Sequence, residues 1–250
     1  MSSINFQRTY FLNDAYEGVR ERAAQVLGKY LRPDLILFNG TERSVTFISE
    51  RLIPAVSTNR PRVMFLFSNP HPHSIHQGMF LSPNTKGREN LFWSSMQDAD
   101  WLNLEEENLT AQEIADKCLN VKYRGPFELI FYCYYSFPTK YPQEIRKIFG
   151  QEYFQQNIEP EAVEEFRRIL QESSAGSVVT FNKEIFNLVA EDHIDLYIDR
   201  LMAGELIQSR IKGFGVPIYL SFPTGWRYNK EYKQFRKSSL DAIRTAIGGR

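Results

Sequence analysis

The sequence predicts an α/β protein with three layers, α/β/α, in which helices cover both faces of a central, mostly parallel sheet of four strands. Two observations favour this fold. First, four short apolar runs end in turn residues, as buried parallel strands do: 63–67, 127–137, 177–181 and 216–220. Second, segments with helical spacing separate these runs, and alternation of strands with helices is typical of a parallel sheet.

A single domain over residues 1–250 is expected, because no internal repeat and no linker rich in Gly, Ser or Pro divides the chain. Residues 1–60 are predicted to form a helical lead-in, with helices at 15–30 and 45–53, and residues 61–250 to form the α/β core. The second of these helices depends on Val45, Ile48 and Leu52 at i, i+3 and i+7 spacing. A last helix is predicted over 230–247.

Composition excludes several classes of protein. The formal net charge is zero, whereas a protein that coats nucleic acid nonspecifically carries an excess of Lys and Arg. Cys118 and Cys133 are the only cysteines, so neither a disulfide framework nor a cysteine metal cluster is expected. No apolar run approaches 18 residues. We therefore expect a cytoplasmic monomer that uses no metal, no organic cofactor and no membrane.

The loop after the first core strand carries the richest set of polar side chains. Asn69-Pro70 directly follows the apolar run, which places an amide at the carboxyl edge of the sheet, and three of the four histidines follow within 71–76. Proline fixes the backbone beside the amide. An ordinary Asn-Pro turn explains the dipeptide as well.

The wider pattern resembles a known family. The stretch VMFLFSNPHPHSIHQGMFLSP, followed by ENLFW, is similar to the first motif of the mismatch-specific and single-strand-selective uracil-DNA glycosylases. That motif has a strand, a G-x-N-P-G loop, a Gly before an apolar residue and Phe, and an N-x-F-W helix start. The matching residues are Asn69, Pro70, Gly78, Phe80, Asn90, Phe92 and Trp93.

Two later segments agree with the same superfamily in order and spacing. SVVTFNKEIFNLV, from Ser177, resembles its late strand and helix, and PIYLSFPTGWRY, from Pro217, resembles the strand before its second active-site motif. In that motif, written H-P-S or N-P-S-G, Thr224 stands in place of Ser. The resemblance covers roughly residues 60–247 and implies a uracil-DNA glycosylase-like fold.

The resemblance implies a set of site residues. It assigns catalysis to Asn69, which orients a water molecule. As the second catalytic residue we expect His71, a donor to the departing base or to a phosphate, with His73 as the alternative. It assigns base binding to a set of residues on three segments: Pro70, Phe80, Tyr134 and Ser136. It assigns the wedge that enters the emptied base stack, and phosphate contacts, to the second loop: Thr224, Gly225, Trp226, Arg227 and Lys230. Phe80 is equally compatible with a plain core position, and each histidine with a structural hydrogen bond.

Three departures from the family pattern bear on function. Phe67 and His71 replace both glycines of G-x-N-P-G, and Gly lets the backbone approach a ligand. Phe222 stands where the second motif begins with His or Asn, so a donor for an anionic base is missing there. The middle strand, FELIFYCYYSFPT, offers no Asn to read a base.

Charge is distributed unevenly along the chain. Residues 210–250 contain nine Lys or Arg and two acids, and one face of the last helix is expected to collect the basic ones: Lys230, Lys233, Lys237 and Arg244. Such a face can contact phosphates, although a solvated helix surface has the same composition.

The leading hypothesis is a DNA glycosylase of base excision repair that hydrolyses the N-glycosidic bond of uracil or another damaged base, with DNA as its partner. The alternative is a catalytically inactive protein that binds nucleic acid or nucleotides and retains the fold. A third possibility is a hydrolase of free nucleosides or nucleotides, which a net charge of zero suits.

Overall fold

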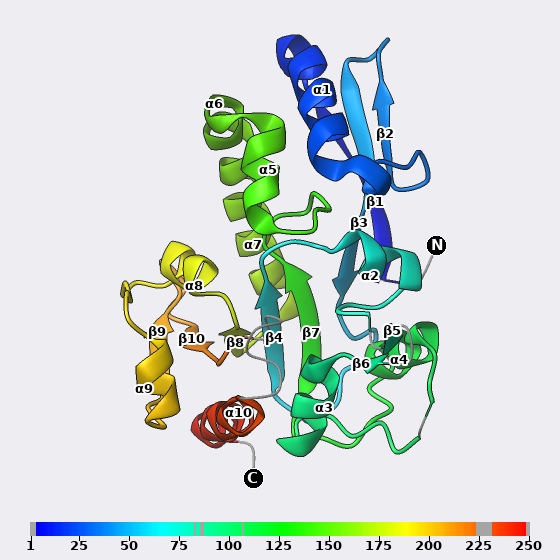
Figure 1. The fold of residues 1–250 in the computed structure, drawn as a ribbon. Helices are drawn as coiled ribbons and strands as arrows, with labels where there is room; N and C mark the ends of the chain where they lie inside the picture. Colours follow the sequence, from blue (N-terminus) through cyan, green and yellow to red (C-terminus); the bar gives the residue numbers. More distant parts are fainter. Residues whose placement is uncertain (1–3, 83, 86–87, 107, 224–231, 249–250) are drawn as a thin grey trace.

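The computed structural model describes residues 4–82, 84–85, 88–106, 108–223 and 232–248. Its main sheet has eight strands in the order β1-β3-β7-β4-β8-β10-β9, with β2 also paired to β3 (Figure 1). The strands of this sheet are β1 (Asn5–Phe11), β2 (Ile36–Asn39), β3 (Ser44–Leu52), β4 (Arg62–Phe67), β7 (Glu128–Cys133), β8 (Ser177–Thr180), β9 (Ile207–Arg210) and β10 (Pro217–Leu220). A separate hairpin joins β5 (Asn84–Thr85) and β6 (Arg88–Glu89).

Helices connect most of these strands. The α-helices are α1 (Tyr16–Leu27), α2 (Pro72–Gln77), α3 (Leu91–Asp98), α4 (Ala111–Leu119), α5 (Pro142–Phe149), α6 (Gln151–Tyr153), α7 (Glu159–Ser173), α8 (Lys183–Val189), α9 (Ile198–Met202) and α10 (Lys233–Ile247). Two 3₁₀-helices, η1 (Asn13–Ala15) and η2 (Gly28–Tyr30), and a π-helix, η3 (Phe154–Ile158), are also present.

The α/β class and the four predicted core strands are confirmed, whereas the predicted size of the sheet is wrong. β7, β4, β8 and β10 lie side by side and run parallel. The sheet is nevertheless mixed and larger than four strands, because β3 extends it antiparallel to β7 and β9 extends it antiparallel to β10. Apolar runs identify the buried parallel strands, but the added strands carry polar residues and do not stand out as such runs.

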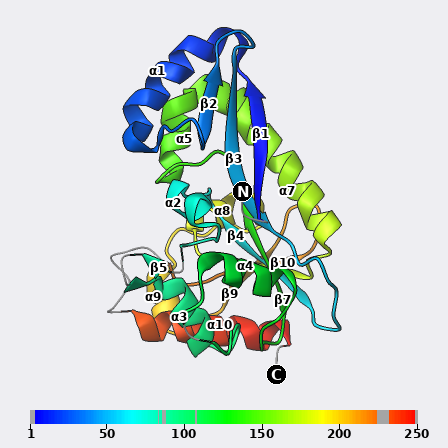
Figure 2. The ribbon, with the colours of Figure 1, turned by 90° about the vertical axis from the view of Figure 1, so that its right-hand side faces the viewer.

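Side chains of the parallel strands alternate between two hydrophobic cores. In β4, Met64 and Leu66 join one core while Val63 and Phe65 join the other. The first core also contains residues of α1, α5, α7 and α8, and the second contains residues of α3, α4 and α10. Helices therefore cover both faces of the sheet, as Figure 2 shows from the side. This alternation follows from the two-residue period of a strand.

The predicted helix at 45–53 is wrong, because Ser44–Leu52 forms β3. Val45, Thr46 and Ile48 are β-branched, which favours an extended backbone, and β3 pairs with β1, β2 and β7. Burial on both faces hides the alternation that marks a strand. The N-terminal segment is therefore a strand-rich unit with α1 at one end of the molecule (Figure 1), not a helical lead-in. The predicted helices at 15–30 and 230–247 are present as α1 and α10.

Candidate functional site

The carboxyl ends of the parallel strands form the candidate site. Numbered along the chain, the four parallel strands follow the spatial order 2-1-3-4, so the connections leave β4 and β8 in opposite directions. In open α/β sheets such a switch point forms a crevice in which ligands bind. Backbone hydrogen bonds bring the adjoining loops together: Tyr135 N–H donates to Ser68 O at 2.8 Å, and Ser221 N–H to Thr180 O at 2.8 Å.

Asn69 lies at this edge and joins two loops. Its side-chain amide donates to the carbonyl oxygen of Thr139 at 2.8 Å, to Thr139 Oγ1 at 3.0 Å and to Pro70 O at 3.2 Å. Ser68 Oγ donates to Asn69 Oδ1 at 3.0 Å. The amide hydrogens are thus engaged, while Oδ1 has a second lone pair that can accept a further hydrogen bond. Asn69 can therefore orient a water molecule only through that oxygen.

His71 lies two residues further on and caps α2. Its Nδ1 accepts a hydrogen bond from the backbone N–H of His73 at 3.1 Å, so the neutral ring carries its hydrogen on Nε2. Burial lowers the pKa of His71 to about 4, and the charges of His73 and Lys140 add to this lowering. At pH 7 His71 is therefore a neutral donor.

Phe80 lies in the hydrophobic core. It is 1% exposed, and its ring centroid is 5.7 Å from those of both Phe67 and Phe131. The Phe67 ring in turn stacks on Phe181 at 6.2 Å. Phe67, which stands where the family motif has Gly, thus covers the side chain assigned to base stacking, and a base could reach Phe80 only after Phe67 moves.

Tyr134 and Ser136 lie apart from Phe80. Tyr134 joins the core on the opposite face of the sheet, against Phe166, and burial raises its pKa. Ser136 Oγ accepts from Arg8 Nη1 at 2.6 Å and donates to Glu165 at 3.3 Å, within an ion-pair network on α7. The structure therefore does not bring these two side chains together with Phe80: Tyr134 packs in the opposite core, and Ser136 is hydrogen-bonded within the ion-pair network.

The second loop is described only in part. Its wedge and phosphate residues lie outside the described residues: Thr224, Gly225, Trp226, Arg227 and Lys230. Phe222, by contrast, is fully buried, and its ring lies 5.5 Å from Tyr232 and 6.0 Å from Phe235. The loop thus leaves the sheet at the expected edge, and its proposed DNA contacts stay a prediction.

The basic residues of α10 are largely neutralised. Lys233 forms an ion pair with Asp98 at 2.6 Å. Lys237 and Arg244 both pair with Asp241, at 2.6 Å and 3.4 Å. Because two carboxylates pair with these three cations, the α10 surface is a weaker candidate for phosphate contacts than its composition indicates.

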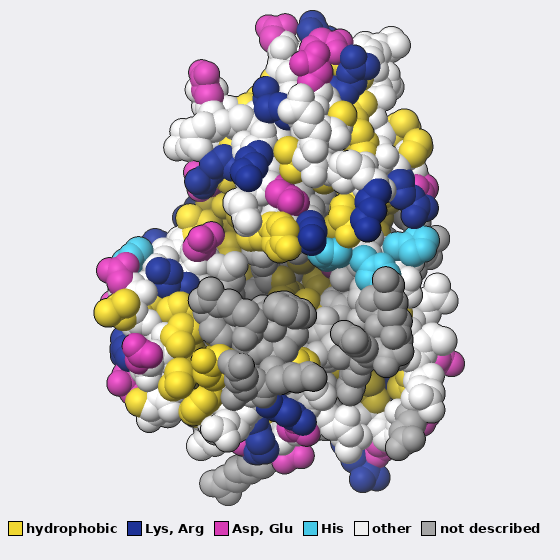
Figure 3. Space-filling model, viewed as in Figure 1, with side chains coloured by type: hydrophobic (Ala, Val, Ile, Leu, Met, Phe, Trp, Pro, Cys, Tyr) yellow, Lys and Arg dark blue, Asp and Glu magenta, His cyan; other side chains and the backbone are white. Residues whose placement is uncertain are grey.

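A different cationic surface borders the candidate site, and sequence analysis did not identify it. Lys29 Nζ lies 5.4 Å from the Tyr30 ring, Tyr30 contacts His71 edge-on at 5.9 Å, and Lys140 lies 4.9 Å from the Tyr141 ring. We call these five residues the cation–aromatic strip. Figure 3 shows histidines gathered across the middle of this face, with Lys and Arg side chains beside them.

Among the described residues, no helix is long and apolar enough to cross a membrane. Within the same residues, no three His, Cys, Asp or Glu side chains are grouped so that they could hold a metal ion. No model of a known protein family matches the chain, and no curated protein matches it either.

Proposed function

We propose that the protein binds DNA at the carboxyl edge of the parallel strands and hydrolyses the N-glycosidic bond of uracil or another damaged base there. The observation that carries this proposal is the strand order 2-1-3-4, with the Asn69-Pro70 loop and the loop that begins at Ser221 both leaving that edge. These are the two loops whose motifs resemble those of the uracil-DNA glycosylases.

The chemistry requires few groups. Loss of a base leaves positive charge on the sugar and negative charge on the base, so the enzyme places water at the sugar and a donor at the base. Asn69 Oδ1 can accept a hydrogen from that water. His71 is neutral, and its Nε2–H can donate a hydrogen bond to the base anion. Neither group is a strong base, so this site suits a bond that is already weakened by damage to the base.

The cation–aromatic strip supplies the nucleic-acid contacts. Lysines that alternate with aromatic rings are typical of surfaces that contact both the phosphates and the bases of a single strand. His71 belongs both to the strip and to the carboxyl edge, so a strand bound on the strip can present a base to that edge.

Replacing Lys140 by alanine is expected to weaken the binding of all oligonucleotides alike and to reduce the slope of log K against log salt by about 1, the loss of one phosphate contact. Fluorescence anisotropy titrations at several salt concentrations measure both effects. The matched control is Lys237→Ala, because Lys237 is paired with Asp241. An equal effect of the two substitutions would contradict the role of the strip.

A second candidate function is nucleic-acid binding without catalysis. Two observations favour it: the Asn69 amide hydrogens are occupied by Thr139 and Pro70, and Phe67 covers Phe80. In this case the carboxyl edge holds a nucleotide but cleaves nothing.

One experiment separates these functions. The protein is incubated with duplex and single-stranded oligonucleotides that each carry one modified base, and alkali then reveals abasic sites. Asn69→Ala protein, purified identically, controls for a contaminating glycosylase. Abasic sites from the wild type alone support the glycosylase. Binding without abasic sites favours the second candidate, and absence of binding removes DNA as the partner.

A further inference from the structure

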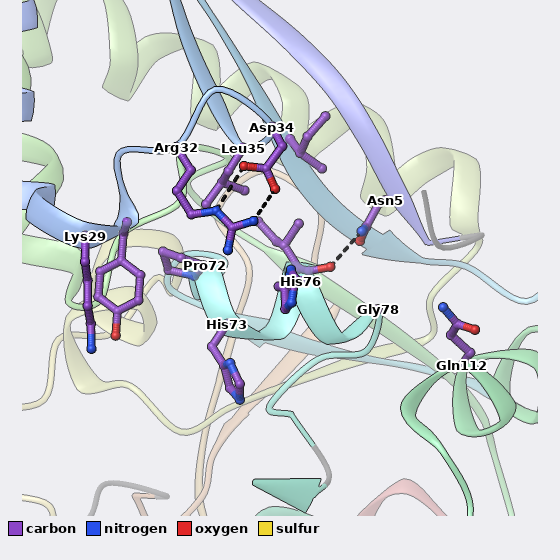
Figure 4. Close-up of a pocket in the computed structure, with 13 residues that line it drawn as sticks. Asn5, Lys29, Arg32, Asp34, Leu35, Pro72, His73, His76, Gly78 and Gln112 are labelled. Atoms are coloured by element: carbon purple, nitrogen blue, oxygen red, sulfur yellow. Dashed lines mark hydrogen bonds and ion pairs between the residues drawn. The ribbon is translucent and has the colours of Figure 1, made fainter.

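A cavity of about 470 Å³ lies beside the cation–aromatic strip, between the N-terminal unit and α2. Its walls come from β1, the connection from η2 to β2, β3 and α2, with Gln112 of α4 also lining it (Figure 4). The connection and α2 are held in place by independent contacts: Asn5 Nδ2 donates to Ile75 O at 2.9 Å, and the backbone N–H of Ile36 to Arg32 O at 2.7 Å. The cavity is therefore formed before any ligand binds.

Two cationic side chains and two histidines line this cavity. Lys29 and Arg32 lie on the connection, and His73 and His76 lie on α2, as Figure 4 shows. Asp34 is the one carboxylate among the lining residues, and it is already engaged by Arg32 through two hydrogen bonds of 3.0 Å and 2.7 Å.

The pairing with Asp34 also orients the guanidinium of Arg32. The ion pair uses Arg32 Nε and Nη2, whereas Nη1 makes no hydrogen bond to the described residues. A planar guanidinium held on one edge by a carboxylate can present its remaining N–H groups to an oxyanion, which is the geometry that phosphate recognition uses. Lys29 adds a donor from the same connection, and the two histidines face the cavity from α2.

The remaining walls suit a larger ligand than an inorganic ion. Leu35, Ile48 and Ile75 are buried apolar residues of the lining, and Tyr30 adds an aromatic ring. A cavity of this volume falls in the range that holds a small organic molecule with most of its surface covered. A nucleotide fits this combination, with its phosphate on Lys29 and Arg32 and its sugar or base on the apolar walls.

We propose that this cavity binds a phosphate monoester carried by a nucleoside. A monoester brings more negative charge to Lys29 and Arg32 than an internal phosphodiester does, and it stands at the end of a molecule, as a concave site requires. The source is either a free nucleotide or the phosphorylated end of a DNA strand on the neighbouring strip. The choice of a nucleotide as the ligand rests on the proposed function, whereas the recognition of a phosphate group does not.

The test is a set of calorimetric titrations with a deoxynucleoside, its 5′-monophosphate, and two short oligonucleotides that differ only in a 5′-phosphate. Each is repeated with Arg32→Gln and with the control Arg43→Gln, an exposed arginine that pairs with Asp14 at 3.6 Å outside the cavity. Thermal unfolding checks that both variants fold.

We expect the phosphorylated member of each pair to bind at least about tenfold more tightly than its unphosphorylated partner, and Arg32→Gln alone to remove that difference. Preference for the phosphorylated oligonucleotide over the mononucleotide identifies a strand end, and the reverse identifies a free nucleotide. Equal binding of phosphorylated and unphosphorylated ligands, or an unchanged Arg32→Gln variant, would overturn the proposal. Absence of base excision leaves this result unaffected, so failure of the proposed function is distinguishable.

Discussion

Replacing Asn69 by alanine is expected to lower base excision by about 100- to 1000-fold while oligonucleotide binding changes little. The reason is that a single positioned polar group at the reacting centre commonly contributes on this scale. In the structure, Oδ1 is the side-chain atom of Asn69 that retains hydrogen-bonding capacity for water, since Thr139 and Pro70 accept from its amide hydrogens. Single-turnover excision and equilibrium binding, measured on the same oligonucleotide, separate the two effects.

Thr139→Val is the matched control for Asn69→Ala. It removes the hydroxyl that accepts from Asn69 at 3.0 Å, but keeps the Thr139 carbonyl and leaves Oδ1 untouched. If Asn69 orients water, Thr139→Val should retain most of the excision activity. If Asn69 only joins two loops, both substitutions should lower thermal stability and excision together. Equal losses in excision and in binding would contradict a chemical role for Asn69.

Replacing Glu50 by glutamine is expected to stabilise the protein at neutral pH. Glu50 is 2% exposed, and its Oε2 finds no hydrogen-bond partner among the described residues. Burial raises the pKa of this carboxyl well above its ordinary value of 4.5. The folded protein therefore keeps a proton there that the unfolded chain releases.

The direction of the pH dependence follows from this difference in proton binding. A folded pKa above the unfolded one makes the native state bind more protons, so the free energy of unfolding falls as pH rises above 4.5. Burying this carboxyl costs more free energy as pH rises, and the glutamine variant avoids this cost.

Urea unfolding of wild type and Glu50→Gln, repeated from pH 5 to pH 8, measures this effect. The stability difference between the two proteins should grow as pH rises above 4.5. Glu17→Gln is the control, because Glu17 is exposed and pairs only with exposed Arg20 at 3.0 Å. If the stabilities of wild type and Glu50→Gln differ by the same amount at every pH, burial does not raise the pKa of Glu50.

The core of the fold could be predicted from the sequence because its signals are local. β4 and β8 are short runs buried on both faces, and each is followed directly by a turn. β3 gave no such signal, because its polar residues Ser44, Ser49 and Glu50 are buried by neighbouring strands and helices that are distant in sequence. A strand whose partners lie far along the chain cannot be distinguished from a helix by spacing alone.

The candidate site shows the same limit. The position of Asn69 at the carboxyl edge followed from its place after a buried strand. The partner of Ser136 could not be predicted, because Arg8 lies 128 residues earlier, on a strand that no sequence pattern indicated. The cation–aromatic strip likewise joins Lys29 and Tyr30 to Lys140 and Tyr141, and only the folded chain brings these two pairs to His71.

The central claim is that nucleic acid lies on the carboxyl edge of the parallel strands, and hydrogen exchange tests it most directly. The ligand is an oligonucleotide with one 2′-fluorinated deoxyuridine, in which the fluorine disfavours positive charge on the sugar and so prevents cleavage. Binding is predicted to slow amide exchange in residues 68–77 and 134–141, relative to the protein alone. Protection confined to α7, β9 or other elements away from this edge would contradict the account.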